Sequence, residues 1–229
     1  MKVSCAQFDT PIVLDDEHPF VLCVENPHEF YRVTREFVFA LGGEQSEFTF
    51  WENDLQIRAD KFGEILTDLF SFELTDKKIT ALLYKHLQQN IMSGTLLVRF
   101  QEVRAEVDRF MADLCASEDF ALDYEEISLE TLLKGCSLKS AKNYEGLLEK
   151  LICYLNLYVQ LKGITFFVFI GLKSVLTDDE LLLLYRHCSL HKISLLLIEN
   201  GKVRPLLACE KAIIITEDLC ELVENIFET

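Results

Sequence analysis

Two continuous apolar runs, separated by a helical pattern, occupy the region from residue 164 to residue 199. The runs cover residues 164–170 and 193–199, and each has the form of a strand buried on both faces. Between them, Thr177 and Glu180 form a capping-box pattern that opens a helix ending at Leu190. This order predicts a parallel βαβ unit and therefore an α/β fold with a parallel sheet.

The first quarter of the chain predicts further elements of the same kind. Residues 20–25 are expected to form a strand. Asn26 and Pro27 then begin a helix that ends before Gly42-Gly43. Three short strands are predicted at 48–51, 55–57 and 64–68, the first two as a hairpin, and a helix at 75–87.

The middle of the chain carries two helical stripes of apolar residues with alternating spacings of three and four. Both stripes are typical of amphipathic helices, and together they predict an antiparallel helical hairpin. A short helix at 129–134 and an acidic segment lie between them. We therefore expect a discontinuous head domain, 1–90 and 145–229, with an inserted helical leg at 91–144. The stripes consist of Phe100, Val103, Val107, Phe110 and Leu114, and of Leu147, Leu151, Tyr154, Tyr158 and Leu161.

The composition indicates a soluble globular protein, since 50% of the 229 residues are hydrophobic and 26% are charged. No apolar run approaches the ~18 residues that a membrane span needs, and the N-terminus lacks the apolar core of a signal peptide. The eight cysteines include no Cys-x-x-Cys pair, which favours reduced, structural thiols. A cytoplasmic location without a membrane partner is therefore expected.

The formal charge of −16 argues against a generally basic nucleic-acid binder. The charge is unevenly distributed, however. Residues 118–130 contain six acids and no base, whereas residues 131–192 contain eight bases and five acids. An acidic molecule of this kind can still present a basic face.

No motif for catalysis accompanies the predicted fold. Gly171-Leu172-Lys173-Ser174 follows a predicted strand, but Lys173 does not directly follow a glycine and the upstream glycine of a phosphate-binding loop is missing. The histidines suggest no metal site, and no Gly-x-Ser-x-Gly elbow occurs. The alternative is a metal-dependent nucleotide hydrolase or nuclease that uses Asp178 or Glu199 at the strand ends of the head.

The acidic segment allows two interpretations. Its carboxylates either extend into water or share a calcium ion, which accepts six to eight oxygens in flexible geometry. The alternating ligands and the central glycine of an EF-hand are absent. Spacing alone leaves both possibilities open.

Two groups of lysines are candidates for contact with DNA phosphates, because such contacts need positive charge within reach and no sequence code. The alternative is ordinary solvated surface. One group lies on the helix predicted from residue 75, and the other follows the acidic segment. The candidates are Lys77, Lys78 and Lys85, and Lys134, Lys139 and Lys142.

The order of several strings resembles the small ring-forming adaptation protein of type II-A CRISPR systems, a DNA-end-binding subunit. The resemblance extends from about Pro11 to Asp218, and its specificity comes from the joint order of strings that are weak singly. They are Val21-Leu22-Cys23-Val24-Glu25-Asn26-Pro27, Leu66-Thr67-Asp68-Leu69-Phe70, Leu82-Leu83-Tyr84-Lys85, Leu132-Leu133-Lys134, Leu176-Thr177-Asp178-Asp179-Glu180-Leu181 and residues 195–199.

The resemblance implies an α/β head, distantly like a P-loop ATPase without its nucleotide site, and a helical leg. It implies a ring of four copies around double-stranded DNA, with Ca²⁺ bound near the leg, for which Asp119, Asp123, Glu125 and Glu126 are the candidates.

The leading hypothesis is therefore a non-catalytic, sequence-independent binder of linear DNA ends, a homotetramer acting in spacer acquisition. Its expected partners are the CRISPR integrase and the RNA-guided nuclease. Besides the enzyme, the alternative is an acidic scaffold that recruits proteins and does not bind DNA.

Overall fold

The computed structural model describes the chain except residues 75–76, 140–143, 202–204 and 226–229, and except the side chains of Lys78, Ser93 and Asn225. Its contacts divide the chain into two compact units. Unit 1 combines Met1–Phe72 with Tyr144–Thr229, and unit 2 is Glu73–Asn143.

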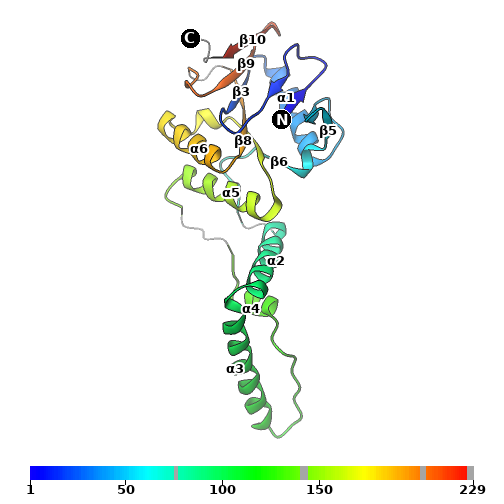
Figure 1. The fold of residues 1–229 in the computed structure, drawn as a ribbon, viewed down its shortest axis with the longest axis vertical. Helices are drawn as coiled ribbons and strands as arrows, with labels where there is room; N and C mark the ends of the chain where they lie inside the picture. Colours follow the sequence, from blue (N-terminus) through cyan, green and yellow to red (C-terminus); the bar gives the residue numbers. More distant parts are fainter. Residues whose placement is uncertain (75–76, 140–143, 202–204, 226–229) are drawn as a thin grey trace. The chain divides into compact units, whose positions relative to one another are not determined.

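A six-stranded sheet with the order β10-β9-β3-β8-β7-β6 forms the centre of unit 1 (Figure 1). The five strands from β9 to β6 run parallel, and β10 pairs with β9 in the antiparallel direction. Helix α6 (Asp178–Leu190) joins the neighbouring parallel strands β7 and β8, which confirms the predicted βαβ unit. The strands are β3 (Phe20–Val24), β6 (Gly63–Leu66), β7 (Phe166–Ile170), β8 (Ser194–Asn200), β9 (Lys211–Ile215) and β10 (Glu221–Asn225).

Alternate residues of the central strands face two different layers, because side chains in a strand point to opposite faces in turn. Val168 of β7 belongs to the core that includes Phe37 of α1 (Pro27–Gly42) and Phe50 of a second, antiparallel sheet. Its neighbour Phe167 lies on the other face, with its ring 6.0 Å from that of Tyr154 in α5 (Leu147–Lys162). Unit 1 therefore has a central sheet between two layers. The second sheet has the order β2 (Ile12–Val13), β1 (Lys2–Ser4), β4 (Thr49–Glu52) and β5 (Leu55–Ile57).

The helix boundaries in unit 1 follow the capping residues. Thr177 and Glu180 make the reciprocal hydrogen bonds of a capping box at the start of α6. The Asn26 side chain accepts hydrogen bonds from two backbone amides at the start of α1, while Glu29 turns to Arg32. Gly43 ends α1 with a φ of 81°, a left-handed conformation that glycine adopts without strain.

Helix α5 corrects one prediction. Its apolar stripe is buried within unit 1, where Leu151, Tyr154 and Tyr158 pack on the face of the sheet that carries Phe167. The predicted antiparallel pairing of this stripe with that of residues 100–114 is therefore wrong. A helix that covers a sheet and a helix that packs on another helix need the same spacing of apolar residues, so the pattern does not distinguish them.

The described residues of unit 2 form three helices and an extended segment. Helix α2 (Lys77–Ser93) contacts both α3 (Leu96–Ala116) and α4 (Leu129–Gly135). Because of these contacts, α2 groups with the helical unit, although the sequence placed residues up to 90 in the head. After α3 the chain returns alongside it, where the Tyr124 hydroxyl donates to the Asp108 carbonyl at 3.1 Å (Figure 1).

The sequence also predicted reduced, structural cysteines and no membrane-spanning segment. None of the eight cysteines, all of them described, is paired in a disulfide, and Cys5, Cys23 and Cys188 are buried. Across the described residues, no helix combines the length and the apolar character needed to span a bilayer.

Candidate nucleic-acid interface

A groove of about 450 Å³ lies between α2 and α4 in unit 2. Successive turns of α2 supply one wall, because residues three or four positions apart share a face of a helix. The other wall belongs to α4, whose start is fixed by the Ser128 hydroxyl accepting from the Thr131 amide at 3.0 Å. The groove is lined by Lys77, Thr80, Ala81, Tyr84, Lys85, Gln88, Glu130 and Lys134.

Three of the six lysines predicted to contact DNA therefore meet in one groove. Lys77, Lys85 and Lys134 face a single carboxylate, Glu130, and all four side chains are exposed. An excess of ammonium groups in an open groove attracts anions, and phosphate oxygens suit it because each ammonium donates up to three hydrogen bonds.

One of these lysines already has a partner. The Lys134 Nζ lies 2.6 Å from a carboxylate oxygen of Glu130, one helical turn away. The hydrogen bond from Lys134 holds the pKa of Glu130 below its ordinary value, and the same bond raises the pKa of Lys134. Both groups are charged at neutral pH, but the pair is open to water and so weak enough for a phosphate to exchange with Glu130.

The other three predicted lysines are less well placed or lie outside the described residues. Lys139 is exposed, and it follows Leu138, whose carbonyl accepts a hydrogen bond from the Tyr84 hydroxyl at 3.0 Å. It does not line the groove. The structure does not describe the side chain of Lys78 or any part of Lys142.

The four predicted calcium ligands are exposed and spread along the segment after α3. They are Asp119, Asp123, Glu125 and Glu126. Asp123 accepts a hydrogen bond from the Tyr124 amide at 2.9 Å, and Glu126 lies 3.6 Å from Arg104.

In the part of the chain that the structure describes, no three His, Cys, Asp or Glu side chains come together in a way that could hold a metal. The described side chains of one chain therefore form no cluster of three carboxylates that could be shared by a calcium ion.

In unit 1, Lys173 occupies the place after β7 where a phosphate-binding loop would have its lysine. The side chain is buried, and its Nζ donates to Glu210 at 2.8 Å. The Tyr185 hydroxyl donates to the same carboxylate at 2.7 Å, and burial together with that carboxylate raises the pKa of Tyr185. The Lys173 amide donates to Glu199 at 2.8 Å.

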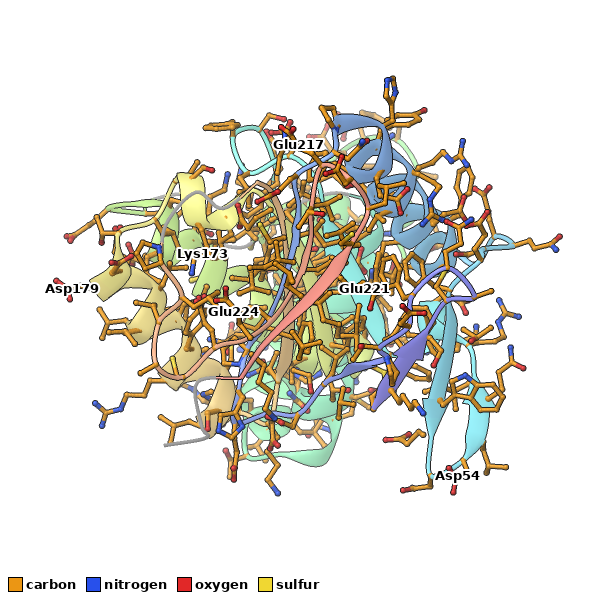
Figure 2. The ribbon with its side chains drawn as sticks, turned by 90° about the horizontal axis from the view of Figure 1, so that it is seen from above. Asp54, Lys173, Asp179, Glu217, Glu221 and Glu224 are labelled. Carbon is orange, nitrogen blue, oxygen red and sulfur yellow. The ribbon has the colours of Figure 1, made fainter. Side chains whose placement is uncertain are left out.

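This arrangement directs both Lys173 and Glu199 into the interior. Figure 2 shows Lys173 within the outline of unit 1, whereas Asp179 lies at its edge. Because the Lys173 ammonium is neutralised by Glu210 away from water, it is not available to a nucleotide phosphate in this conformation. Asp178, the other residue considered for an enzyme, is exposed in the first turn of α6.

Sequence reasoning missed the groove as a unit, and in particular Tyr84 and Gln88. The spacing of residues 77, 81, 84 and 88 places these positions on one face of a helix, which was a usable signal. No pattern in the sequence indicated that α4 packs opposite that face of α2.

Comparison with known proteins identifies the family. The model of the CRISPR-associated protein family Cas_Csn2 matches residues 41–219. The CRISPR-associated protein Csn2 of Streptococcus agalactiae is 20% identical over 204 residues, which span 89% of this chain and 90% of that protein.

A similar fold occurs in the crystal structure of Stu0660 of Streptococcus thermophilus, with a TM-score of 0.56 and 11% identity over 98% of this chain and 76% of that one. At such identity the likeness concerns the fold alone. The family match covers well over half of the chain and agrees with the order of strings in the sequence. The chain therefore belongs to the Csn2 family of type II-A CRISPR-associated adaptation proteins.

Proposed function

We propose that this chain is a non-catalytic protein that binds linear double-stranded DNA through the phosphate backbone, without reading the base sequence. Four copies form a ring that is threaded by a DNA end, in the cytoplasm, during spacer acquisition. The integrase and the RNA-guided nuclease of the CRISPR system are its expected partners. The observation that carries the proposal is the gathering of Lys77, Lys85 and Lys134 in one groove of a chain with a formal charge of −16.

The distribution of charge supports this reading. DNA would be repelled by most of so acidic a surface, so binding requires that lysines be concentrated where the duplex passes. The groove of unit 2 provides such a concentration, and Lys139 lies on the chain just beyond it. Lys78 and Lys142 are proposed as further phosphate contacts from the sequence.

DNA binding is tested by the affinity for a linear duplex and for the same DNA as a relaxed closed circle, over a series of salt concentrations. We expect a clear preference for the linear form. We also expect that Lys85→Ala lowers the slope of log affinity against log salt by about 0.9 for each phosphate that the lysine no longer neutralises.

Lys61→Ala is the matched control, because Lys61 is an exposed lysine of unit 1 outside the groove. Equal affinity for linear and circular DNA contradicts threading. If Lys85→Ala and Lys61→Ala have equal effects, the groove is not where DNA binds. If no DNA binds at any salt concentration, the alternative of an acidic scaffold that recruits proteins is the correct one.

Calcium belongs to the proposal as a stabiliser of the ring. Since the described His, Cys, Asp and Glu side chains of one chain form no group of three that could hold a metal, we propose that oxygens from a second copy complete the site. Chelation is expected to reduce the mass of the assembly in light scattering, and Asp123→Ala to have the same effect. If the mass is unchanged in both cases, the acidic segment is a solvated loop and the calcium part of the proposal fails.

A further inference from the structure

Two histidines meet at the C-terminal end of α6, in unit 1. His187 lies in the last turn of the helix and His191 is the residue that caps it. Their rings lie against each other, with centroids 4.4 Å apart and planes inclined by 38°. The sequence suggested no metal site here, because the helix was expected to end at Leu190, before the second histidine. The helical hydrogen bonds nevertheless continue to His191, whose amide donates to the His187 carbonyl at 3.2 Å.

A third side chain orients the His187 ring. The Nε2 atom of this ring lies 3.1 Å from the Oδ1 atom of Asn156 in α5. Since an amide oxygen only accepts, Nε2 carries the hydrogen, and Nδ1 carries the lone pair of the neutral ring. Histidines that bind metals are usually held in this way, by donating the second ring N–H to an oxygen. The contact with Asn156 therefore leaves Nδ1 of His187 available to a metal.

The surroundings of the two rings favour a metal ion over two protons. Two imidazolium ions in contact would repel each other, and burial, together with the nearby His191, lowers the pKa of His187. The neutral ring is the form that binds metals. The pair also lies at the C-terminal end of a 13-residue helix, where the carbonyl groups of the last turn carry partial negative charge. His191 is exposed, so an ion reaches the pair directly from water.

We propose that His187 and His191 form a binding site for a divalent late transition-metal ion such as Zn²⁺ or Ni²⁺. Two histidines four positions apart at a helical turn chelate such ions, because both rings reach one ion from the same face. Imidazole nitrogens suit Zn²⁺, Ni²⁺ and Cu²⁺, whereas Ca²⁺ takes oxygens. Among the described residues no group of three His, Cys, Asp or Glu side chains could hold a metal, so we expect water to complete the coordination.

The bound ion stabilises the packing of two helices of unit 1. His187 is joined to α5 through Asn156, and α5 and α6 contact each other. An ion that binds this folded arrangement more tightly than the unfolded chain raises the free energy of unfolding. The site goes beyond the proposed function and shares no residue with the groove of unit 2. It can therefore fail while DNA binding stands, and the reverse.

Isothermal titration calorimetry of the reduced protein with Ni²⁺ tests the site. We expect one Ni²⁺ per chain, which an excess of Ca²⁺ does not displace. His191→Ala should abolish this binding. Asn156→Ala should weaken it by about tenfold, because the hydrogen bond that orients His187 is lost. His28→Ala is the matched control and should leave binding unchanged, since His28 is an exposed histidine at the start of α1 in the same unit. Circular dichroism confirms that the variants stay folded.

The rival ligands are the exposed thiols of Cys136 and Cys220. Co²⁺ distinguishes them from imidazole, because a thiolate ligand adds an intense charge-transfer band in the near ultraviolet, and we expect no such band. Ni²⁺ should also raise the urea midpoint of the wild type and leave that of His191→Ala unchanged. The proposal is overturned if the wild type binds no Ni²⁺, if His191→Ala binds it as tightly as His28→Ala does, if the thiolate band accompanies binding, or if Ca²⁺ displaces the ion.

Discussion

In α5, Leu151 and Leu155 are fully buried in unit 1, whereas in α3 of unit 2 the residues Val103 and Phe110 remain 45% and 64% exposed. The two helices have the same spacing of apolar residues and similar lengths. They differ in what lies opposite, since α5 packs on a sheet of aromatic and aliphatic side chains. The comparison shows that an amphipathic pattern predicts that a helix packs against another surface. The pattern does not predict which surface that is.

The same contrast exists between two ion pairs. In unit 1, Lys173 and Glu210 are buried together, with side chains 3% and 0% exposed. In unit 2, Lys134 and Glu130 form the same kind of pair at 62% and 51% exposure. Unit 1 therefore uses this pair for its own structure, whereas unit 2 keeps the corresponding pair accessible to another molecule.

The largest effect is expected for the buried pair. Glu210→Ala leaves the Lys173 ammonium, the Tyr185 hydroxyl and the Leu207 amide without their acceptor. Removing the carboxylate partner of a buried ammonium should lower the free energy of unfolding by about 3–5 kcal/mol, measured by urea titration. Glu130→Ala, the matched change in the exposed pair, should barely alter it.

A double variant sharpens this prediction. Replacing both Lys173 and Glu210 by methionine should be less damaging than Glu210→Ala alone, because the Lys173 ammonium is then removed together with its acceptor. Similar losses for Glu210→Ala and Glu130→Ala would mean that the two pairs are equivalent, and the contrast between the units would fail.

A smaller but still large difference is expected between matched leucines of the two helices. Leu155→Ala empties a fully buried position of α5 and should cost about 2–5 kcal/mol in the free energy of unfolding. Leu114→Ala, at a position 41% exposed, should cost less than about 0.5 kcal/mol in dilute solution, where chains do not associate. An equal cost under these conditions would show that α3 is covered within its own chain.

The central sheet could be predicted because its evidence is local. The apolar run at 164–170, the capping box at Thr177 and the second run at 193–199 each depend on neighbouring residues. The structure places β7, α6 and β8 there. The start of α4 after Ser128 was predicted for the same reason, and α1 ends at Gly42, one residue beyond the predicted end before Gly42-Gly43.

The candidate site was harder to predict because its residues converge from separate elements. The spacing of Lys77 and Lys85 lies within one helix, but the arrival of Lys134 opposite them depends on how α4 packs. Likewise, Lys173 was recognised from its loop, whereas its partner Glu210 is 37 positions away and has no motif. The proposed calcium ligands share a sequence neighbourhood, which does not by itself bring their oxygens together.

The next prediction concerns acid stability of unit 1. The hydrogen bond from the Glu47 amide lowers the pKa of Glu36, and this outweighs its burial, with Arg35 adding to the effect. A carboxylate with a lowered pKa stabilises the fold above its unfolded pKa of about 4.5, and this contribution is lost as the pH falls through the lower folded value.

Glu36→Gln should therefore reduce the free energy of unfolding by about 1–2 kcal/mol at pH 7, and the difference from the wild type should shrink in acid. Urea titrations between pH 7 and pH 3 measure it. Glu44→Gln, at an exposed position nearby, is the control. A difference that stays constant over this range would show that the Glu36 carboxylate is not the cause.

The smallest effects are expected at the residues that cap α6 in unit 1 and α4 in unit 2. The cap of α6 should affect stability, whereas the cap of α4 should also affect DNA binding. Thr177→Ala removes the acceptor of the Glu180 amide and the partner of its carboxylate, and should lower the free energy of unfolding by about 1 kcal/mol. Ser128→Ala removes the corresponding acceptor of the Thr131 amide in unit 2. Because α4 is short and carries Lys134, this change should weaken DNA binding in a titration, whereas Thr177→Ala should not. If Thr177→Ala weakens DNA binding as much as Ser128→Ala, the groove is not where the duplex is held.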